Sequence, residues 1–386
     1  MPDASESLEA RVGRRLHAIR GARLQRTLAP PAGTDLSSND YHGLARDPRV
    51  VRAMADALER DGVGSTGSRL LRGDREAFSA VERRFAGFKQ AERALYFSSG
   101  YLANLAVLAT LPERGDVIYS DEHNHASLID GIRLSHADRV VFAHNDLGSL
   151  ARALAARPSG GHGFVVTESL FSMDGDVPPL QDYAALCREA GATLVVDEAH
   201  AVGLYGRQGR GLVEALGIDP GGCLSVNTAG KALGVSGAFV AGPAWAIEYL
   251  VQRARPFIFS TAPPPSVAAA IDASLDIVER EPWRRERLTQ RAAHLRAALR
   301  SADVPAPEGF TQIIPIVLGD NERALAAAAA LQARGFDVRA IRPPSVAPGT
   351  ARLRISVNAN LSEDTLDRFV EALLATGIVP CSAASS

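Results

Sequence analysis

The chain has almost no lysine. Of its 42 lysines and arginines, only Lys89 and Lys231 are lysines, and the remaining 40 are arginines. Either residue supplies a plain positive charge at a surface, so a retained lysine suggests a position that needs an amine. Arginine stays protonated and cannot condense with an aldehyde, whereas lysine in a suitable pocket can act as a nucleophile or a base. We therefore expect chemistry at Lys231, in the small-residue loop Asn227–Gly234; the alternative is an ordinary solvated loop lysine.

Cysteine is scarce as well. There are three cysteines, Cys187, Cys223 and Cys381, well separated and with no Cys-x-x-Cys pair. This odd number favours buried thiols in a reducing compartment over a disulfide framework. The sequence has no run of about 20 apolar residues to span a bilayer. Its charged first 26 residues are followed by no apolar run of the signal-peptide kind. These features predict a cytoplasmic protein with no membrane partner.

An excess of charge of one sign is also missing. The chain has 42 basic and 44 acidic residues, for a formal net charge of −2. Binding nucleic acid requires a basic field, so we expect no nucleic-acid partner. The composition, 46% hydrophobic and 22% charged over 386 residues, is that of a globular protein long enough for two or three domains.

The apolar pattern predicts an α/β fold. Between residues 94 and 240, short continuous apolar runs alternate with helical patterns, which is typical of βαβ units with a mostly parallel sheet buried on both faces. The expected strands are residues 116–120, 140–143, 164–167, 193–196, 223–226 and 237–241. The expected helices include residues 8–28, 47–60, 147–156, 182–189, 267–302, 324–334 and 362–376.

The domain prediction follows from the breaks in this pattern. We expect an N-terminal helix and segment (residues 1–45), a large domain (46–280) and a smaller α+β domain (281–386). The last of these should contain strands near residues 312–317, 338–342 and 353–357.

Polar side chains follow four of the expected strands. In open α/β sheets, ligands bind beyond the carboxyl ends of the strands, so these groups should gather at one edge. They are Asp121, His123, His125, Glu168, Ser172, Asp197, His200, Asn227, Thr228 and Lys231. In addition, the Ser98-Ser99-Gly100-Tyr101 turn opens a helical pattern, which indicates either a phosphate site or an ordinary N-cap.

The same residues allow two other kinds of site. His123, His125, Asp197 and His200 are potential metal ligands, but they lack the compact spacing of an HExxH or CxxC site, so we expect no metal. A hydrolase nucleophile at Ser99 or Ser172 is the other alternative, but the Gly-x-Ser-x-Gly elbow is missing.

Pyridoxal phosphate (PLP) explains the set with a single cofactor. It needs an amine for its aldehyde, an acid for its pyridine nitrogen, an aromatic ring to stack on it, a hydrogen bond to its phenolic oxygen and a cup for its phosphate. In that order, the residues that match are Lys231, Asp197, His125, His200 and Ser99–Tyr101.

Longer stretches strengthen this interpretation. Ser37–Tyr41, Glu168–Asp176, Asp197–Gly203 and Thr228–Lys231 resemble the α-oxoamine synthases over roughly residues 39–354. These fold-type I PLP enzymes condense an amino acid with an acyl thioester and lose CO2. The resemblance implies a large domain with a mostly parallel, seven-stranded type of sheet flanked by helices, a smaller C-terminal domain, and a homodimer with shared active sites.

The resemblance also implies roles for individual residues. Lys231 would form the Schiff base, Asp197 would pair with the pyridine nitrogen, and His125 would stack on the ring. Hydrogen bonds near the phenolic oxygen would come from His200 and Ser172. The phosphate would be held by Ser99, Gly100, Tyr101 and Thr228, and by Thr261 of a second subunit.

Substrate contacts follow in the same way. Arg354 would bind the amino-acid carboxylate, and Asn39 and Tyr41 would lie near the reacting acyl group. The stretch Ile341–Val346 resembles the biotin-pathway branch, which implies L-alanine and a pimeloyl thioester, on coenzyme A or a carrier protein, as substrates. Arg23 would then meet the far carboxylate. The alternatives are glycine with acetyl-CoA, serine with a long-chain thioester, an aminotransferase or lyase, and a non-catalytic subunit of the same fold.

Overall fold

The chain folds into two compact units. A computed structural model describes residues 6–378, and its contacts group Asn39–Leu288 into a large unit and residues 6–38 with 289–378 into a small unit. The predicted domain boundaries near residues 45 and 280 stay predictions. None of the helices in residues 6–378 is long and apolar enough to cross a membrane. Cys187 and Cys223 are buried free thiols, and Cys381 lies outside the described residues.

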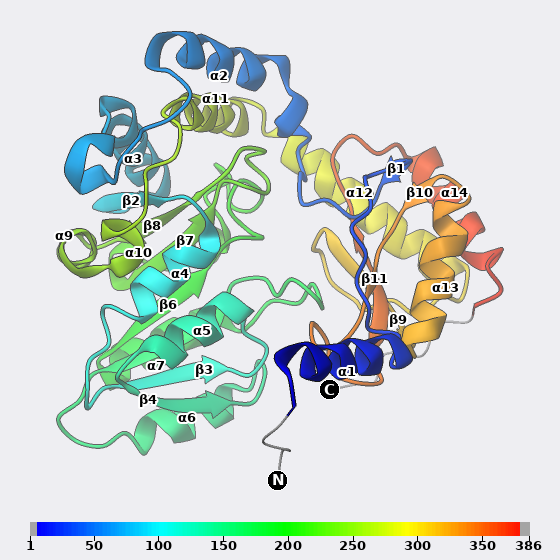
Figure 1. Cartoon of the computed structure of the whole chain (residues 1–386), viewed down its shortest axis with the longest axis horizontal. Coiled ribbons are helices and arrows are strands. Elements are labelled where there is room, and N and C mark those ends of the chain that lie inside the picture. Colours follow the sequence, from blue (N-terminus) through cyan, green and yellow to red (C-terminus); the bar gives the residue numbers. More distant parts are fainter. Residues whose placement is uncertain (1–5, 379–386) are drawn as a thin grey trace. The chain divides into compact units, whose positions relative to one another are not determined.

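A seven-stranded sheet forms the centre of the large unit (Figure 1). Its strands, in the order β2-β8-β7-β6-β5-β3-β4, are β2 (Arg93–Phe97), β3 (Val117–Asp121), β4 (Asp138–Phe142), β5 (Gly163–Glu168), β6 (Ala192–Asp197), β7 (Cys223–Thr228) and β8 (Ala238–Gly242). Neighbours from β7 to β4 run parallel, while β8 runs antiparallel to both β7 and β2. The predicted α/β fold with a mostly parallel sheet is confirmed. The edge strand β2 was not among the strands expected from the sequence.

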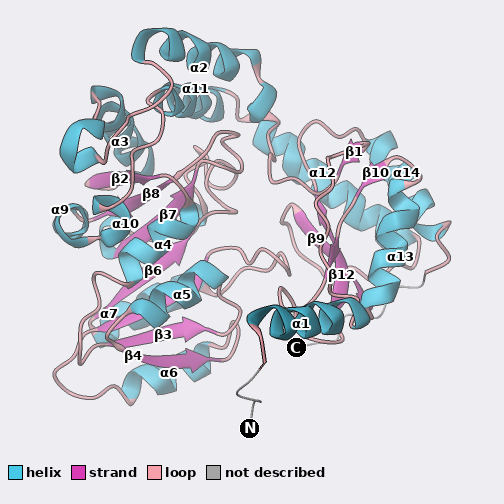
Figure 2. Ribbon diagram, in the orientation of Figure 1, coloured by secondary structure: helices cyan, strands magenta, loops and turns pink. Residues whose placement is uncertain are grey.

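Helices cover both faces of this sheet, as Figure 2 shows. Alternate strand residues point to opposite faces. Val166 packs in one cluster with residues of α4, α5 and α9, whereas Val165 packs in another with residues of α6 and α7. Burial on both sides explains why the strands read as continuous apolar runs. The helices of this unit are α2 (Pro48–Asp61), α3 (Glu76–Lys89), α4 (Gly100–Leu108), α5 (Ala126–Leu134), α6 (Leu147–Ala155), α7 (Leu180–Ala190), α8 (Leu212–Ala215), α9 (Ala244–Arg253), α10 (Arg255–Ile258) and α11 (Ser266–Arg280).

Two helix predictions were wrong in their extent. The single helix expected over residues 267–302 is two helices, because α11 ends at Arg280 and α12 (Trp283–Ser301) begins after Pro282. Proline lacks an N–H and disfavours a helical conformation in the residue before it. The helix expected over residues 8–28 ends earlier: α1 (Leu8–Gly21) stops at a glycine, and Arg23 then adopts a positive φ of 57°.

The small unit is α+β, as expected. Its antiparallel sheet has the order β11-β12-β9, formed by β11 (Ala340–Ile341), β12 (Ala351–Ser356) and β9 (Ile313–Gly319). The N-terminal segment joins this unit through β1 (Thr34–Asp35), which pairs in parallel with β10 (Phe336–Asp337). The helices of this unit are α1, most of α12, α13 (Asn321–Gln332) and α14 (Glu363–Leu374).

Candidate active site

The carboxyl ends of neighbouring strands bring the predicted polar groups together. Glu168 at the end of β5 is in register with Asp197 at the end of β6, and Asp197 is in register with Val226 of β7. The chain then turns at Glu198, whose N–H donates to the carbonyl of Val226 at 2.7 Å. This places Asp197, His200 and the loop after β7 at one edge of the sheet, as predicted from the order of strands and polar residues.

A chain of side-chain contacts runs from Lys231 into the unit. Lys231 Nζ lies 2.8 Å from His200 Nε2, and His200 Nδ1 lies 2.7 Å from the hydroxyl of Tyr41. The Tyr41 hydroxyl also lies 3.0 Å from Asn39 Oδ1. Tyr41 and His200 are both buried. Lys231 is therefore not an ordinary solvated loop lysine: its amine is held against an imidazole that can exchange a proton with it.

A second buried chain holds Asp197. The backbone N–H of Ala199 donates to Asp197 Oδ1 at 2.8 Å, and Asn104 Nδ2 donates to Asp197 Oδ2 at 2.7 Å. The same Asn104 amide lies 2.9 Å from Ser127 Oγ, which lies 2.7 Å from Nδ1 of His125. Donors on both oxygens stabilise the ionised carboxylate. The acid predicted to meet a pyridine nitrogen and the imidazole predicted to stack on the ring are thus linked through two intervening side chains.

Sequence reasoning missed Asn104 and Ser127. Asn104 lies in the middle of α4 and Ser127 near the start of α5, and both are almost fully buried. A polar side chain inside an apolar helical run such as Leu102–Leu108 was the available signal, because buried polar groups need hydrogen-bond partners. The sequence gives no indication of which partner that is.

Glu168 is a further buried acid at this edge. Burial raises its pKa well above the usual range, and the nearby charge of Asp197 raises it further, while Lys231 acts in the opposite direction. A neutral carboxyl group can donate as well as accept a hydrogen bond. The two neighbouring acids therefore differ: Asp197 is held by two donors, whereas Glu168 favours its protonated form.

The start of α4 forms a small cup with the end of β7. Ser99 caps the helix, its Oγ accepting from the N–H of Leu102 at 3.3 Å. A Cβ on Gly100 would come within 3.9 Å of the Thr228 side chain, so the backbone of Gly100 faces that hydroxyl. Thr228 Oγ1 itself accepts from the N–H of Gly230 at 3.2 Å. Helix N–H groups beside a hydroxyl suit a phosphate.

The remaining residues predicted to meet PLP lie as follows. The Tyr101 hydroxyl is hydrogen-bonded to Asp130. Tyr101 therefore offers only its backbone N–H, in the first turn of α4, to the expected phosphate site. Ser172 lies in the loop that follows β5. Thr261 is exposed and pairs through its backbone with Ser68 of its own chain.

The predicted substrate residues fall in both units. Asn39 and Tyr41 belong to the large unit and take part in the Lys231 chain. Arg354 lies on β12 of the small unit, is buried, and donates from Nη1 to Ser356 Oγ at 2.8 Å. Arg23, also in the small unit, is exposed and forms an ion pair with Glu322 at 3.3 Å.

The residues considered for a metal site or as a hydrolase nucleophile lie as follows in the described part of the chain. Within residues 6–378, no group of three or more His, Cys, Asp or Glu side chains is placed to hold a metal ion. Ser99 is the N-cap of α4, and its sequence lacks the Gly-x-Ser-x-Gly elbow of a hydrolase nucleophile.

His42, next to Tyr41, makes stability depend on pH. Its Nε2 donates to the carbonyl of Gly203 at 2.8 Å, and burial, with some repulsion from Arg285 and Arg284, lowers its pKa to about 4. The unfolded chain takes up this proton near pH 6.5, so stability should fall as the pH drops from 6.5 to 4, by about 3 kcal/mol in all. Urea midpoints at pH 7 and pH 5 measure the part of this fall that lies above pH 5, roughly 2 kcal/mol. The stability of His42→Gln should fall less over the same pH range. An equal fall would show that His42 is not the cause of this pH dependence.

The residues present fit PLP. The fit rests on an amine held against an imidazole, a carboxylate fixed by two donors and a helix start facing a threonine hydroxyl. Fold and site together define a PLP-dependent transferase. A match to the family described as aminotransferase class I and II spans residues 31–373, and the chain belongs to this family.

Similar proteins narrow the class. The chain is 47% identical over 377 residues to 8-amino-7-oxononanoate synthase from Anaeromyxobacter dehalogenans, with 94% of each chain covered. Among solved structures, serine palmitoyltransferase from S. paucimobilis with bound PLP and myriocin is 30% identical, with a TM-score of 0.90 and coverage of 96% of this chain and 98% of that one. An 8-amino-7-oxononanoate synthase from Francisella tularensis is 30% identical, with a TM-score of 0.77 and coverage of 88% and 96%. The expected likeness to the α-oxoamine synthases is confirmed, and the chain is a PLP-dependent acyltransferase.

Proposed function

We propose that the chain condenses L-alanine with a pimeloyl thioester to give 8-amino-7-oxononanoate, CO2 and a free thiol, a step of biotin biosynthesis. The observation that carries this proposal is the Lys231 amine, 2.8 Å from His200 beside the held carboxylate of Asp197. The choice of alanine and of the pimeloyl chain is supported by the 47% identity to a protein named 8-amino-7-oxononanoate synthase.

Residues of the large unit carry the chemistry. Bound PLP supplies an electron sink for charge that develops at the amino-acid Cα. Lys231 removes the Cα proton as general base and later returns a proton to the same carbon. His200 accepts or donates a hydrogen bond at Lys231 Nζ and, with Ser172, near the phenolic oxygen. The Asp197 carboxylate would pair with the pyridine nitrogen of bound PLP, and His125 would pack on its ring.

Other residues bind and orient. Ser99, Gly100, Tyr101 and Thr228 hold the phosphate, and Thr261 does so from a second subunit of a homodimer. Arg354 binds the alanine carboxylate through two parallel hydrogen bonds, for which a guanidinium is shaped. Asn39 and Tyr41 line the acyl position.

Arg23 meets the far carboxylate of the pimeloyl chain. Its present ion pair with Glu322 is 3.3 Å long and exposed at both ends, and such a pair contributes little to stability, so it is readily exchanged for a substrate carboxylate. The two buried thiols, Cys187 and Cys223, suit a reducing compartment such as the cytoplasm, where we place the enzyme.

A second candidate is condensation of serine with a long-chain acyl thioester. It is favoured by the TM-score of 0.90 to serine palmitoyltransferase, against 0.77 to the Francisella 8-amino-7-oxononanoate synthase. Both candidate reactions would use the same large-unit residues of this chain and would differ only in the substrates that are bound.

One experiment separates them. Purified PLP-loaded protein is given alanine, glycine or serine in combination with acetyl-, pimeloyl- or palmitoyl-CoA, and release of free thiol is followed. We expect pimeloyl-CoA with alanine to give the highest kcat/KM. The highest value with serine and palmitoyl-CoA would establish the second candidate, and keto-acid formation without thiol release would indicate an aminotransferase. A repeat with pimeloyl carrier protein tests the form of the thioester.

A further inference from the structure

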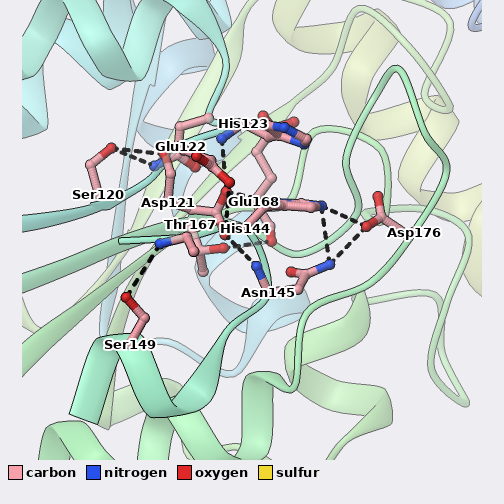
Figure 3. A network of polar contacts seen from close by, with 12 residues as sticks. Ser120, Asp121, Glu122, His123, His144, Asn145, Ser149, Thr167, Glu168 and Asp176 are labelled. Atoms are coloured by element: carbon pink, nitrogen blue, oxygen red, sulfur yellow. Dashed lines mark hydrogen bonds and ion pairs between the residues drawn. The ribbon is translucent and has the colours of Figure 1, made fainter. Parts of the chain in front are cut away.

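His144 lies between two carboxylates in the large unit (Figure 3). Asp121 is the last residue of β3, His144 follows the end of β4, and Asp176 belongs to the loop after β5. His144 Nδ1 lies 2.8 Å from Asp121 Oδ1, and its Nε2 lies 2.7 Å from Asp176 Oδ2. The imidazole therefore bridges segments that are separated in the sequence and lie at the ends of adjacent strands.

The geometry requires a charged imidazole. Ionised carboxylates only accept hydrogen bonds, so a histidine that bonds one through each ring nitrogen must carry a proton on both. Burial opposes this charge, but the hydrogen bonds and attraction from Asp121 and Asp176 outweigh it and raise the pKa of His144 to about 10. A pKa this far above 7 favours the imidazolium form of His144 at neutral pH.

Backbone and amide groups complete this cluster. The N–H groups of His123 and Asn145 donate to the two oxygens of Asp121 at 2.8 and 3.0 Å. The Asn145 side chain donates to Asp176 Oδ2 at 2.7 Å. Asp121 is fully buried, whereas the Asp176 side chain is 38% exposed. The cluster therefore ties a partly buried loop to a buried anchor on the sheet.

The loop held in this way carries Ser172. The His144 ring packs edge-on against Phe171, with ring centroids 4.5 Å apart, and stacks on His123 at 4.0 Å. The N–H of Phe171 donates to the carbonyl of Asp176 at 3.0 Å, which closes the loop around Ser172. Both ends of this short loop, Phe171 and Asp176, are therefore in contact with the same imidazolium.

We propose that His144 is a positioning residue, whose imidazolium fixes the Phe171–Asp176 loop so that Ser172 stands where the cofactor needs its hydroxyl. This inference rests on the proposed cofactor-binding role of Ser172. His144 is not among the residues assigned above to the cofactor or the substrates. Its charge is required because a neutral side chain cannot donate strong, charge-assisted hydrogen bonds to two carboxylates at once.

The first test uses the cofactor-free protein. In His144→Gln, amide hydrogen exchange across residues 171–176 should be faster by about tenfold or more, because the loop opens without its cation. Asp176→Asn, which alters the partly exposed partner, should act in the same direction and serves if His144→Gln folds poorly. His162→Gln removes an exposed imidazole that contacts Thr193 and should leave exchange in this loop unchanged. Unchanged exchange in both cluster variants would overturn the proposal.

The second test asks whether His144 acts through Ser172. PLP affinity should fall by roughly tenfold in His144→Gln, about the value of one charge-assisted hydrogen bond, and the visible spectrum should shift as in Ser172→Ala. The double variant should be no worse than the poorer single variant, since both remove the same contact. Additive losses would contradict this role. Because neither test uses an amino acid or a thioester, a failure of the proposed acyl-transfer reaction would leave these results interpretable.

Discussion

Replacing Lys231 by alanine is expected to lower kcat by about a thousandfold or more while leaving the fold intact. The residue lies in a loop after β7 and its amine contacts His200, so truncation removes a reactive group without leaving a buried charge unpaired. A positioned general base contributes roughly 100- to 10,000-fold to a rate, and loss of the covalent link to the cofactor adds to that. The measurement is exchange of the Cα proton of bound alanine for deuterium, followed by NMR.

Lys231→Arg provides the matched control. It keeps the positive charge but cannot lose its proton or form the link, so it should be as inactive as the alanine variant. Borohydride reduction of the yellow wild-type protein should label Lys231, and neither variant should be labelled at that position. Proton exchange at the wild-type rate in Lys231→Ala would assign the base to another residue, and His200 would be the next to examine.

The sheet could be predicted because its cause is local in the sequence. Each central strand is buried on both faces and therefore appears as an apolar run, and the residue after each run faces the ligand edge. The pairing of β1 with β10 could not be predicted, since two-residue strands leave no periodic pattern. The break at Pro282 was visible in the sequence but was overridden by the helical pattern on either side.

The candidate site also has residues that could be predicted from the sequence and residues that could not. Asp197 and Lys231 could be found because a single residue type carries the chemistry and its position follows a strand. The Asn104–Ser127 link and the His144 cluster could not, because each joins side chains from separate elements. Such contacts arise from how helices and strands pack, and the sequence around any one partner gives no indication of the others.

Lys89, the other lysine of the chain, has a structural role. Lys89 is the last residue of α3 and is 4% exposed, with its ammonium group bonded to the carboxylate of Glu198 and to the carbonyl of Arg210. Glu198 is fully buried, and its other oxygen accepts from the N–H of Val213 at 3.0 Å. Because Glu198 follows Asp197 directly, this ion pair anchors the turn that leads to His200.

Lys89→Met is therefore expected to destabilise the large unit by about 3–5 kcal/mol, the usual cost of removing one partner from a buried ion pair. The loss arises because Glu198 would remain buried without its counter-charge, so Lys89→Met combined with Glu198→Gln should recover much of the stability. Urea-unfolding midpoints compare the wild type, Lys89→Met, Glu198→Gln and the double variant, with the exposed Arg52→Met as the surface control. A loss no larger than that of the control would show that the pair contributes little. A double variant as unstable as the sum of both single variants would instead point to packing around the lysine stem rather than charge.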